Sequence, residues 1–251
     1  MEEPSLEELE KEVAKSYDRV AQGYNAPSHK TVRNFEVMTL AFLRENLFTE
    51  VKSGQLILDL GGGRGYVARR LSKTGCRVFI GDISVEMLRC AIQDSGGRVM
   101  SYVQLSAFKL PFKDNTFDVV LTLLCGAYLR IEVIVEVYRV LKHRGTYIGT
   151  ETPKEWVIAS QQQRDIPSNK IWFKDHEGSV VLLPFRYVYS LKELTSLLEG
   201  YGFQVVVKDT LRPEGLISSE NISTVNRNVA KILGLSVHEI PVLSAWIACK
   251  P

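Results

Sequence analysis

The sequence predicts an α/β fold built on a doubly wound, largely parallel sheet. Short apolar runs of strand length alternate with segments that have helical spacing through most of the 251 residues. Leu56–Leu60 is typical of a strand buried on both faces, and Gly61, Gly63 and Gly65 follow it at alternate positions. Helical spacing then resumes over Tyr66–Lys73. Strand, glycine turn and helix together predict a place where the backbone approaches a ligand closely, because side chains are missing there.

Two classes of ligand use a glycine turn of this kind. Dinucleotide-binding turns read G-x-G-x-x-G, and the third glycine falls on Tyr66 when counted from Gly61, or on Ala68 when counted from Gly63. The match to a dinucleotide turn is therefore weak. The longer pattern D-x-G-x-G-x-G, which begins at Asp59, fits throughout. It resembles motif I of the class I S-adenosylmethionine-dependent methyltransferases.

Composition limits the other classes of partner. The chain has 31 Lys and Arg against 29 Asp and Glu and no densely basic stretch, which disfavours a nucleic-acid partner. Its four cysteines are scattered, as expected of free thiols in a reducing compartment. The N-terminus is acidic and unlike a signal peptide, and no apolar run approaches the roughly 20 residues that span a bilayer. We therefore expect a cytoplasmic protein without a membrane span.

Two helices are predicted ahead of the first strand, over Leu6–Gln22 and Thr31–Leu47. The segment Tyr17–Asn25, at the end of the first helix, resembles the entry segment of small-molecule methyltransferases. That resemblance implies that Tyr17 and Tyr24 fold over the cofactor. The alternative is that both rings fill the seam between this cap and the core.

An acid ends the second predicted strand. A strand is predicted over Cys76–Gly81, Asp82 follows it, and a helix is predicted over Ser84–Gln93. A carboxylate about 20 residues beyond the glycine turn suits a ribose, because it can accept from both vicinal hydroxyls. The pattern G-D-I-S-x-E-M-L also resembles motif II of the methyltransferases. The alternative, that Asp82 or Ser84 only caps the helix, is compatible with the ribose role.

The segment Ser106–Asp118 follows a predicted strand over Met100–Leu105 and resembles motif III and the run to motif IV of the family. Where the family has an acid that accepts from the adenine amino group, this chain has Ser106. A hydroxyl accepts without charge and with shorter reach. Either the cofactor binds less tightly, or the backbone of Ala107 and Phe108 carries adenine recognition.

The fourth predicted strand, Phe117–Leu124, is expected at the centre of the sheet. Ligands of open α/β sheets bind outside the carboxyl ends of the strands, so Leu123 to Tyr128 should lie where the methyl group is delivered. The sequence LTLLCGAY lacks the Asp/Asn-Pro-Pro-aromatic motif of DNA adenine methyltransferases. It also lacks the carboxylates of metal-dependent catechol-type enzymes, so we expect no metal.

The later segments complete the resemblance. The helix Glu132–Lys142 and the strand Gly145–Thr150 resemble the motif VI region, and further strands are predicted over Phe203–Asp209 and Leu243–Lys250. In this family the last strand enters antiparallel between the fifth and sixth. The resemblance therefore implies a Rossmann-like, doubly wound seven-stranded sheet with an antiparallel last strand.

The aromatic, proline-containing stretch Thr152–Tyr189 interrupts this plan. Long irregular segments of this kind are more often functional covers than passive links, so we predict a lid over a flat or apolar acceptor. The alternative is a peripheral hairpin with a small cluster of its own. The chain is thus predicted as one domain with a helical cap (1–50), a cofactor core (51–151), a substrate lid (152–189) and a C-terminal part of the sheet (190–251) with an insertion at 211–242.

The resemblance implies S-adenosylmethionine as the cofactor and metal-independent, in-line transfer of its methyl group to a small apolar or aromatic acceptor, on O, C or N, as in the ubiquinone/menaquinone-type enzymes. The residues that it assigns to the cofactor are Tyr17, Tyr24, Asp59, Gly61, Gly63, Gly65, Asp82, Ile83, Met87, Ser106, Ala107, Phe108, Leu123 and Leu124. A base is needed only where the acceptor is protonated, and the candidates are His29, His176, Tyr128 and Glu151.

Two other functions are weighed against methyl transfer. A nicotinamide-dependent oxidoreductase is disfavoured by Tyr66 and by the phase of the glycines. A methyltransferase-fold protein that binds the cofactor as a scaffold or as a non-methylating catalyst stays open, because of Ser106 and because no base is evident.

Overall fold

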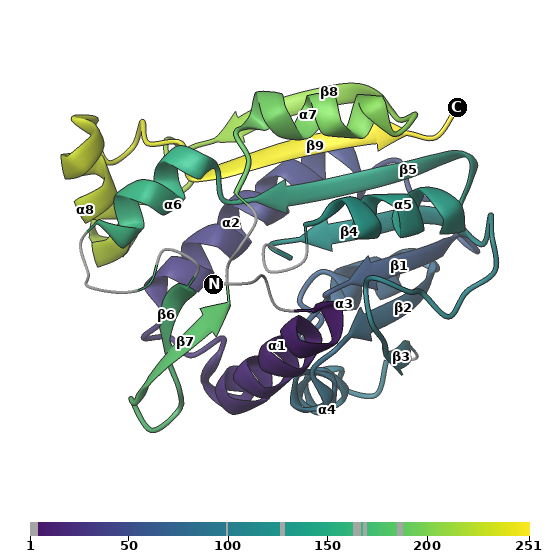
Figure 1. Cartoon of the computed structure of the whole chain (residues 1–251), viewed down its shortest axis with the longest axis horizontal. Helices are drawn as coiled ribbons and strands as arrows, with labels where there is room; N and C mark the ends of the chain where they lie inside the picture. The colour runs from purple at the N-terminus through teal and green to yellow at the C-terminus, as the bar shows by residue number, and fades with distance from the viewer. Residues whose placement is uncertain (1–4, 99, 126–128, 163–166, 168–169, 185–187) are drawn as a thin grey trace.

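The computed structural model describes residues 5–98, 100–125, 129–162, 167, 170–184 and 188–251. Its centre is a seven-stranded sheet with the order β3-β2-β1-β4-β5-β9-β8 (Figure 1). The strands are β1 (Leu56–Leu60), β2 (Arg77–Asp82), β3 (Ser101–Gln104), β4 (Phe117–Leu123), β5 (Leu141–Glu151), β8 (Gln204–Leu211) and β9 (Leu243–Cys249). The first five run parallel, and β9 is antiparallel to both β5 and β8. The predicted seven-stranded sheet with an antiparallel last strand is confirmed.

Helices cover both faces of this sheet. They are α1 (Leu6–Val20), α2 (Lys30–Asn46), α3 (Ala68–Leu71), α4 (Val85–Asp94), α5 (Ile131–Val140), α6 (Lys154–Gln161), α7 (Leu191–Gly200) and α8 (Thr224–Leu233). Alternate residues of a strand point to opposite faces, so Ile57 packs into one cluster with α2 and α3, whereas Leu58 and Leu60 pack into a second with α5 and α7. Figure 1 shows α5 and α7 in front of the sheet and α2 behind it.

The helix predicted over Tyr66–Lys73 was too long. The structure has only the four-residue α3, followed by a 3₁₀ turn over Ser72–Thr74. Gly75 ends this turn in a left-handed conformation with φ 83°, which a helix cannot continue through. The start is delayed because the turn of the glycine segment extends through a hydrogen bond from Gly65 N–H to Gly62 O.

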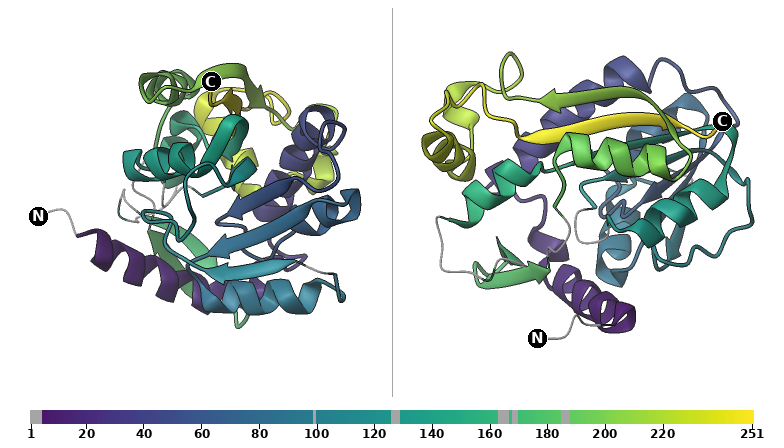
Figure 2. Two further views of the ribbon diagram at one scale, coloured as in Figure 1. Left: turned by 90° about the vertical axis from the view of Figure 1, so that its right-hand side faces the viewer. Right: turned by 45° about the horizontal axis from the view of Figure 1, so that its top comes forward.

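The stretch 152–189 holds regular structure, including a hairpin, which the sequence analysis gave as the alternative to a lid. It contains α6 and an antiparallel hairpin of β6 (Lys170–Lys174) and β7 (Val180–Pro184). This hairpin packs along α1, as Figures 1 and 2 show. Helix α8 packs against α2 and α6 at the same end of the molecule. The cap helices and the hairpin therefore meet above the carboxyl ends of β1, β4 and β5.

No helix among the described residues combines the length and apolar character needed to cross a bilayer.

Candidate functional site

The glycine turn after β1 presents bare backbone to a cavity. Gly61, Gly63 and Gly65 have φ values of 69°, 51° and 67°, in the left-handed region that favours glycine. A Cβ at Gly61 would lie 2.0 Å from Sγ of Cys125, so a side chain there has no room. At Gly63, the nearest atom to such a Cβ would be Sδ of Met87, at 3.9 Å. The chain is therefore packed tightly behind the turn and open in front of it.

Asp82, the last residue of β2, holds this turn in place. Its Oδ2 accepts from the amide of Gly63 at 2.9 Å, and its Oδ1 accepts from the amide of Ser84 at 2.9 Å. Ser84 is the N-cap of α4, because its hydroxyl accepts from the amide of Met87 at 3.1 Å. Burial raises the pKa of Asp82 to about 6. Each oxygen keeps a lone pair with which it can accept from a ligand hydroxyl.

Asp59 lies beneath the same turn and is 2% exposed. A Cβ at Gly62 would lie 2.9 Å from Cγ of Asp59, so the carboxyl group fills the space under the turn. Burial, and then the nearby charge of Asp82, raise the pKa of Asp59 to about 7. The two carboxyl groups give this region its negative electrostatic character.

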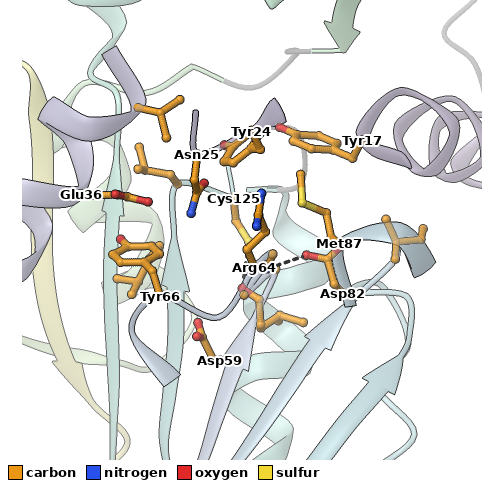
Figure 3. Close-up of a pocket in the computed structure, with 18 of the residues that line it drawn as sticks. Tyr17, Tyr24, Asn25, Glu36, Asp59, Arg64, Tyr66, Asp82, Met87 and Cys125 are labelled. Atoms are coloured by element: carbon orange, nitrogen blue, oxygen red, sulfur yellow. Dashed lines mark hydrogen bonds between the residues drawn. The ribbon is translucent and has the colours of Figure 1, made fainter. Parts of the chain in front are cut away.

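Most of the residues that sequence analysis assigned to the cofactor line a single cavity, here called the turn cavity (Figure 3). They are Tyr17, Tyr24, Asp59, Gly61, Gly63, Asp82, Ile83, Met87, Ala107, Leu123 and Leu124. In Figure 3 Tyr17 and Tyr24 lie across the cavity from Asp59, with Cys125 between. Gly65, Ser106 and Phe108 are not among the lining residues.

The side chain of Ser106 is engaged elsewhere. Its hydroxyl accepts from the amide of Phe108 at 3.0 Å and donates to the carboxylate of Glu10 on α1. The segment predicted for adenine thus contacts the turn cavity through Ala107, while Ser106 joins this loop to the cap helix.

A larger cavity of about 560 Å³ adjoins the turn cavity. It is lined by residues of the cap, of the end of β5 and of the hairpin, including Tyr17, Tyr24, His29, Val32, Phe35, Leu124, Glu151, Trp156, Ile171, Trp172, Phe173, His176 and Leu183. Five residues line both cavities: Tyr17, Tyr24, Val32, Phe35 and Leu124. The stretch predicted as a lid therefore forms one wall of a chamber beside the glycine turn.

Three of the four candidate bases line this large cavity. Glu151, at the end of β5, is 6% exposed, and its Oε1 accepts from the amide and the hydroxyl of Thr152 at 2.8 and 3.2 Å. Nδ1 of His29 lies 3.2 Å from the carbonyl oxygen of Tyr24, whereas the side chain of His176 is half exposed. Burial raises the pKa of Glu151 to about 7. Tyr128, the fourth candidate, lies outside the described residues.

Comparisons with known proteins bear on this geometry. A methyltransferase domain model matches residues 58–149. Sterol 24-C-methyltransferase of Kluyveromyces lactis is 30% identical over 169 residues, which cover 64% of this chain and 43% of the relative. The ubiquinone/menaquinone biosynthesis C-methyltransferase UbiE of Neisseria gonorrhoeae is 31% identical over 150 residues, 57% of each chain. This chain therefore spans about half the length of these curated relatives.

A solved structure described as the DhpI–SAM–HEP complex superposes with a TM-score of 0.65, at 20% identity and with full coverage of both chains. Residues 58–149 thus match a methyltransferase domain, and the chain resembles the class I S-adenosylmethionine-dependent methyltransferases. The chain keeps the family's glycine turn and the acid at the end of the second strand. It departs from the family where Ser106 stands in place of an acid.

The residues that line the turn cavity are chemically suited to S-adenosylmethionine. The bare backbone at Gly63 leaves room for a ligand, and Asp82 offers two carboxylate oxygens for the hydroxyl groups of a ribose. The faces of Tyr17 and Tyr24 suit a sulfonium cation, because aromatic rings attract positive charge at their faces. The carboxylate and the aromatic rings thus match the sugar and the charged centre of the cofactor.

Sequence reasoning missed several lining residues of the turn cavity. They are Asn25, Val32, Phe35, Glu36, Leu60, Gly62, Arg64, Tyr66 and Leu105, whereas Cys125, which also lines the cavity, falls in the segment expected at the point of methyl delivery. Asn25 and Glu36 come from the cap, whose placement over the turn depends on tertiary packing and has no local pattern. Gly62 and Arg64 lie within the glycine motif itself, and their lining positions could have been inferred from it. Within the described part of the chain, no group of three or more His, Cys, Asp or Glu side chains could hold a metal ion.

Proposed function

We propose that this protein transfers the methyl group of S-adenosylmethionine to a small-molecule acceptor bound in the large cavity, without a metal. The observation that carries the proposal is the shared wall of the two cavities, formed by Tyr17, Tyr24, Val32, Phe35 and Leu124. A cofactor in the turn cavity has its sulfonium end near that wall, and an acceptor on the other side needs only a short approach. The protein then contributes position and exclusion of water, because the sulfonium methyl is already activated.

The size and lining of the large cavity favour a small acceptor. Its volume of about 560 Å³ suits a drug-sized molecule, and its walls are largely apolar and aromatic. The names of the two matched relatives also favour a small acceptor, since one is a sterol methyltransferase and the other acts in ubiquinone/menaquinone biosynthesis. In this proposal, residues 152–189 form the substrate lid and residues 1–50 the cap.

The site residues keep the roles that the sequence suggested, as proposals. Asp82 binds the ribose, the turn at Gly61 and Gly63 lies along the cofactor, and Ala107 contacts the adenine. Because Ser106 is held by Glu10, we assign adenine recognition to the backbone at Ala107.

Two measurements test this function in sequence. Isothermal titration with S-adenosylhomocysteine should give saturable binding with one site per chain. The protein should then transfer a tritiated methyl group from S-adenosylmethionine to a compound in a deproteinised small-molecule extract. Binding without transfer to any compound would contradict methyl transfer and favour a scaffold or a non-methylating catalyst.

A further inference from the structure

Glu151 presents a carboxylate oxygen without a protein partner to the large cavity. Both of its hydrogen bonds from protein, donated by the amide and the hydroxyl of Thr152, go to Oε1. Among the described residues none donates to Oε2, although the side chain is more than nine-tenths buried. Oε2 is accessible from the cavity and is not an enclosed atom, so a ligand that displaces water from it must supply a hydrogen-bond donor in return. Oε2 therefore marks a place for a hydrogen that a ligand donates.

This oxygen lies close to the point of methyl delivery. Strand β5 pairs with β4, and the amide of Leu124 donates to the carbonyl of Thr150 at 2.8 Å. Leu124, which lines both cavities, is thus held beside the residue that precedes Glu151. An acceptor atom that donates to Oε2 would sit near the shared wall, where the methyl group arrives.

The side of the cavity toward the hairpin is built of rings. Phe173 stacks on Tyr24 with centroids 5.0 Å apart and an interplanar angle of 11°. The ring of His29 meets Phe173 edge-on at 4.5 Å, and Phe35 meets Trp156 edge-on at 5.4 Å. Flat aromatic surfaces of this kind favour a planar ligand.

The charged groups around the cavity favour an anion. Lys30 and Lys174 both line it, and neither forms an ion pair with a described residue. The acid on that side, Asp175, is already paired with Arg19 at 3.2 Å and accepts two backbone amides. Both lysines are exposed, and the ammonium of Lys30 also donates to the carbonyl oxygen of Glu220 at 3.0 Å. Two ammonium groups on one side of the cavity attract a negative group and repel a cationic amine.

We infer that the acceptor is a planar hydroxylated aromatic acid, whose hydroxyl donates to Oε2 of Glu151 and whose acid group faces Lys30 and Lys174. The inference rests on the proposed methyl transfer and specifies its acceptor and the atom methylated. A neutral hydroxyl satisfies the buried oxygen, a ring matches the walls, and an acid group matches the lysines.

The step balances as an O-methylation. The acceptor oxygen forms a bond to the methyl carbon while the carbon–sulfur bond of the sulfonium breaks, and that electron pair stays on sulfur as a neutral thioether. The hydroxyl proton passes to Oε2 of Glu151, which returns it to solvent when the product leaves. No oxidant or reductant is required.

The test presents the full-length protein and tritiated S-adenosylmethionine with a panel of one- and two-ring compounds. Each hydroxylated aromatic acid is matched by its amide, by its O-methyl ether and by an aromatic amine of the same size. We expect label in the hydroxylated acids, at least tenfold less in the matched amides, and none in the ethers. Transfer confined to amines would overturn this inference and leave the proposed function standing. Transfer to none of the compounds, with S-adenosylhomocysteine still bound, would contradict both.

Two variants locate the roles of the charged groups. Glu151→Gln should lower kcat by about 100-fold, the usual scale for a general base, while the affinity for S-adenosylhomocysteine changes less than twofold. The double variant Lys30→Met/Lys174→Met should raise KM for the acid about tenfold and leave KM for its amide unchanged. Equal effects on acid and amide would overturn the anion site. If a variant folds poorly, the preference of the unmodified protein for the acids over their matched amides still tests the anion site.

The pH dependence of kcat/KM distinguishes a base at Glu151 from a purely structural role of this residue. With the unmodified protein kcat/KM should rise through about pH 7, because the base must be ionised. In Glu151→Gln it should follow only the ionisation of the acceptor hydroxyl.

Other titratable groups near Glu151 do not account for such a rise. The neighbouring phenols and thiol of Tyr17, Tyr24, Cys125 and Tyr147 have pKa values raised by burial and stay neutral in this range. His29 and His176 also face the cavity, as do Lys30, Lys174 and Asp175. His29→Gln and His176→Gln should therefore keep the rise, and its loss in either would overturn the assignment to Glu151.

Discussion

At the scale of single residues, Asp82 connects the fold to the chemistry. The carboxylate accepts one amide from the glycine turn and one from the start of α4, so it fixes both elements before any ligand arrives. Hydrogen bonds that involve a charged group contribute more than neutral ones. In the proposed function, the remaining lone pairs of the same carboxylate accept from a ribose, so one side chain has both a structural and a binding role.

Replacing Asp82 by Ala should weaken the binding of S-adenosylhomocysteine. The loss of charge-assisted hydrogen bonds corresponds to about 1.5–3 kcal/mol, or roughly a 10- to 150-fold rise in Kd. Isothermal titration measures it, with Asp209→Ala, an exposed acid on β8, as the matched control. An unchanged Kd in the Asp82 variant would refute the ribose assignment.

The affinity for S-adenosylhomocysteine should also depend on pH. Burial raises the pKa of Asp82 to about 6, and the protonated acid is a poorer acceptor for two hydroxyl groups. Kd should therefore be nearly constant above pH 7 and rise as the pH falls below about 6. Titrations between pH 5 and pH 8 would measure the change. A Kd that stays flat across this range would mean that the charge of Asp82 takes no part in binding.

At the scale of elements, helix α1 joins the cofactor loop to the hairpin. Asp18 of α1 accepts from the hydroxyl of Ser84 at 2.6 Å and from the amide of Glu86 at 3.1 Å, at the start of α4. Nearer the start of α1, Glu10 accepts from Ser106. Near its end, Arg19 pairs with Asp175, which lies between β6 and β7. The helix thus fixes the cap over the turn cavity and also holds the β6–β7 hairpin.

Changing Ser106 to Asp should not restore a family-like adenine contact by itself. The new carboxylate would lie against Glu10, and the repulsion should cost roughly 1 kcal/mol, about 2–4 °C in Tm, and weaken S-adenosylhomocysteine binding by loosening α1. The double variant Ser106→Asp/Glu10→Gln removes the repulsion and should recover Tm. Calorimetry and titration of both variants decide the matter. Tighter binding in the single variant, without loss of Tm, would contradict the proposed role of α1.

The sheet could be predicted because its strands carry their own signals. Leu56–Leu60 and Phe117–Leu123 are mostly apolar segments of strand length, and both are found within a residue of their expected bounds. The hairpin β6–β7 was given only as an alternative and without strand bounds, because its alternation is weak and its residues pack on α1 instead of on the sheet. Likewise, the engagement of Ser106 by Glu10 joins residues 96 positions apart, and no local pattern encodes such a contact.

At the scale of the whole molecule, buried acids accumulate around the two cavities. Burial raises the pKa of Asp59 and Glu151 to about 7 and that of Asp82 to about 6, above their ordinary values of 3.8 and 4.5. The folded state therefore binds protons more tightly than the unfolded chain between about pH 4 and pH 7. Carboxyl groups with lowered pKa values, such as those of Glu136 and Asp118, change stability mainly at more acidic pH.

The free energy of unfolding of the ligand-free protein should accordingly fall as the pH rises from about 5 to about 7.5. Each raised pKa contributes stability that is complete below its unfolded value and lost as the pH passes its folded value, on the order of a few kcal/mol for the three acids together. Scanning calorimetry should give a higher Tm at pH 5.5 than at pH 7.5, and a smaller difference in the variant Asp59→Asn/Asp82→Asn/Glu151→Gln. A Tm that increases with pH over this interval would show that these groups are not buried as described.

The central claim is that the turn after β1, with Asp82 beside it, binds the nucleoside of S-adenosylmethionine. Isothermal titration of the purified chain with S-adenosylhomocysteine and, separately, with NAD measures it most directly. The account predicts saturable binding of one S-adenosylhomocysteine per chain and no heat of binding with NAD. Binding of NAD in place of S-adenosylhomocysteine would contradict it.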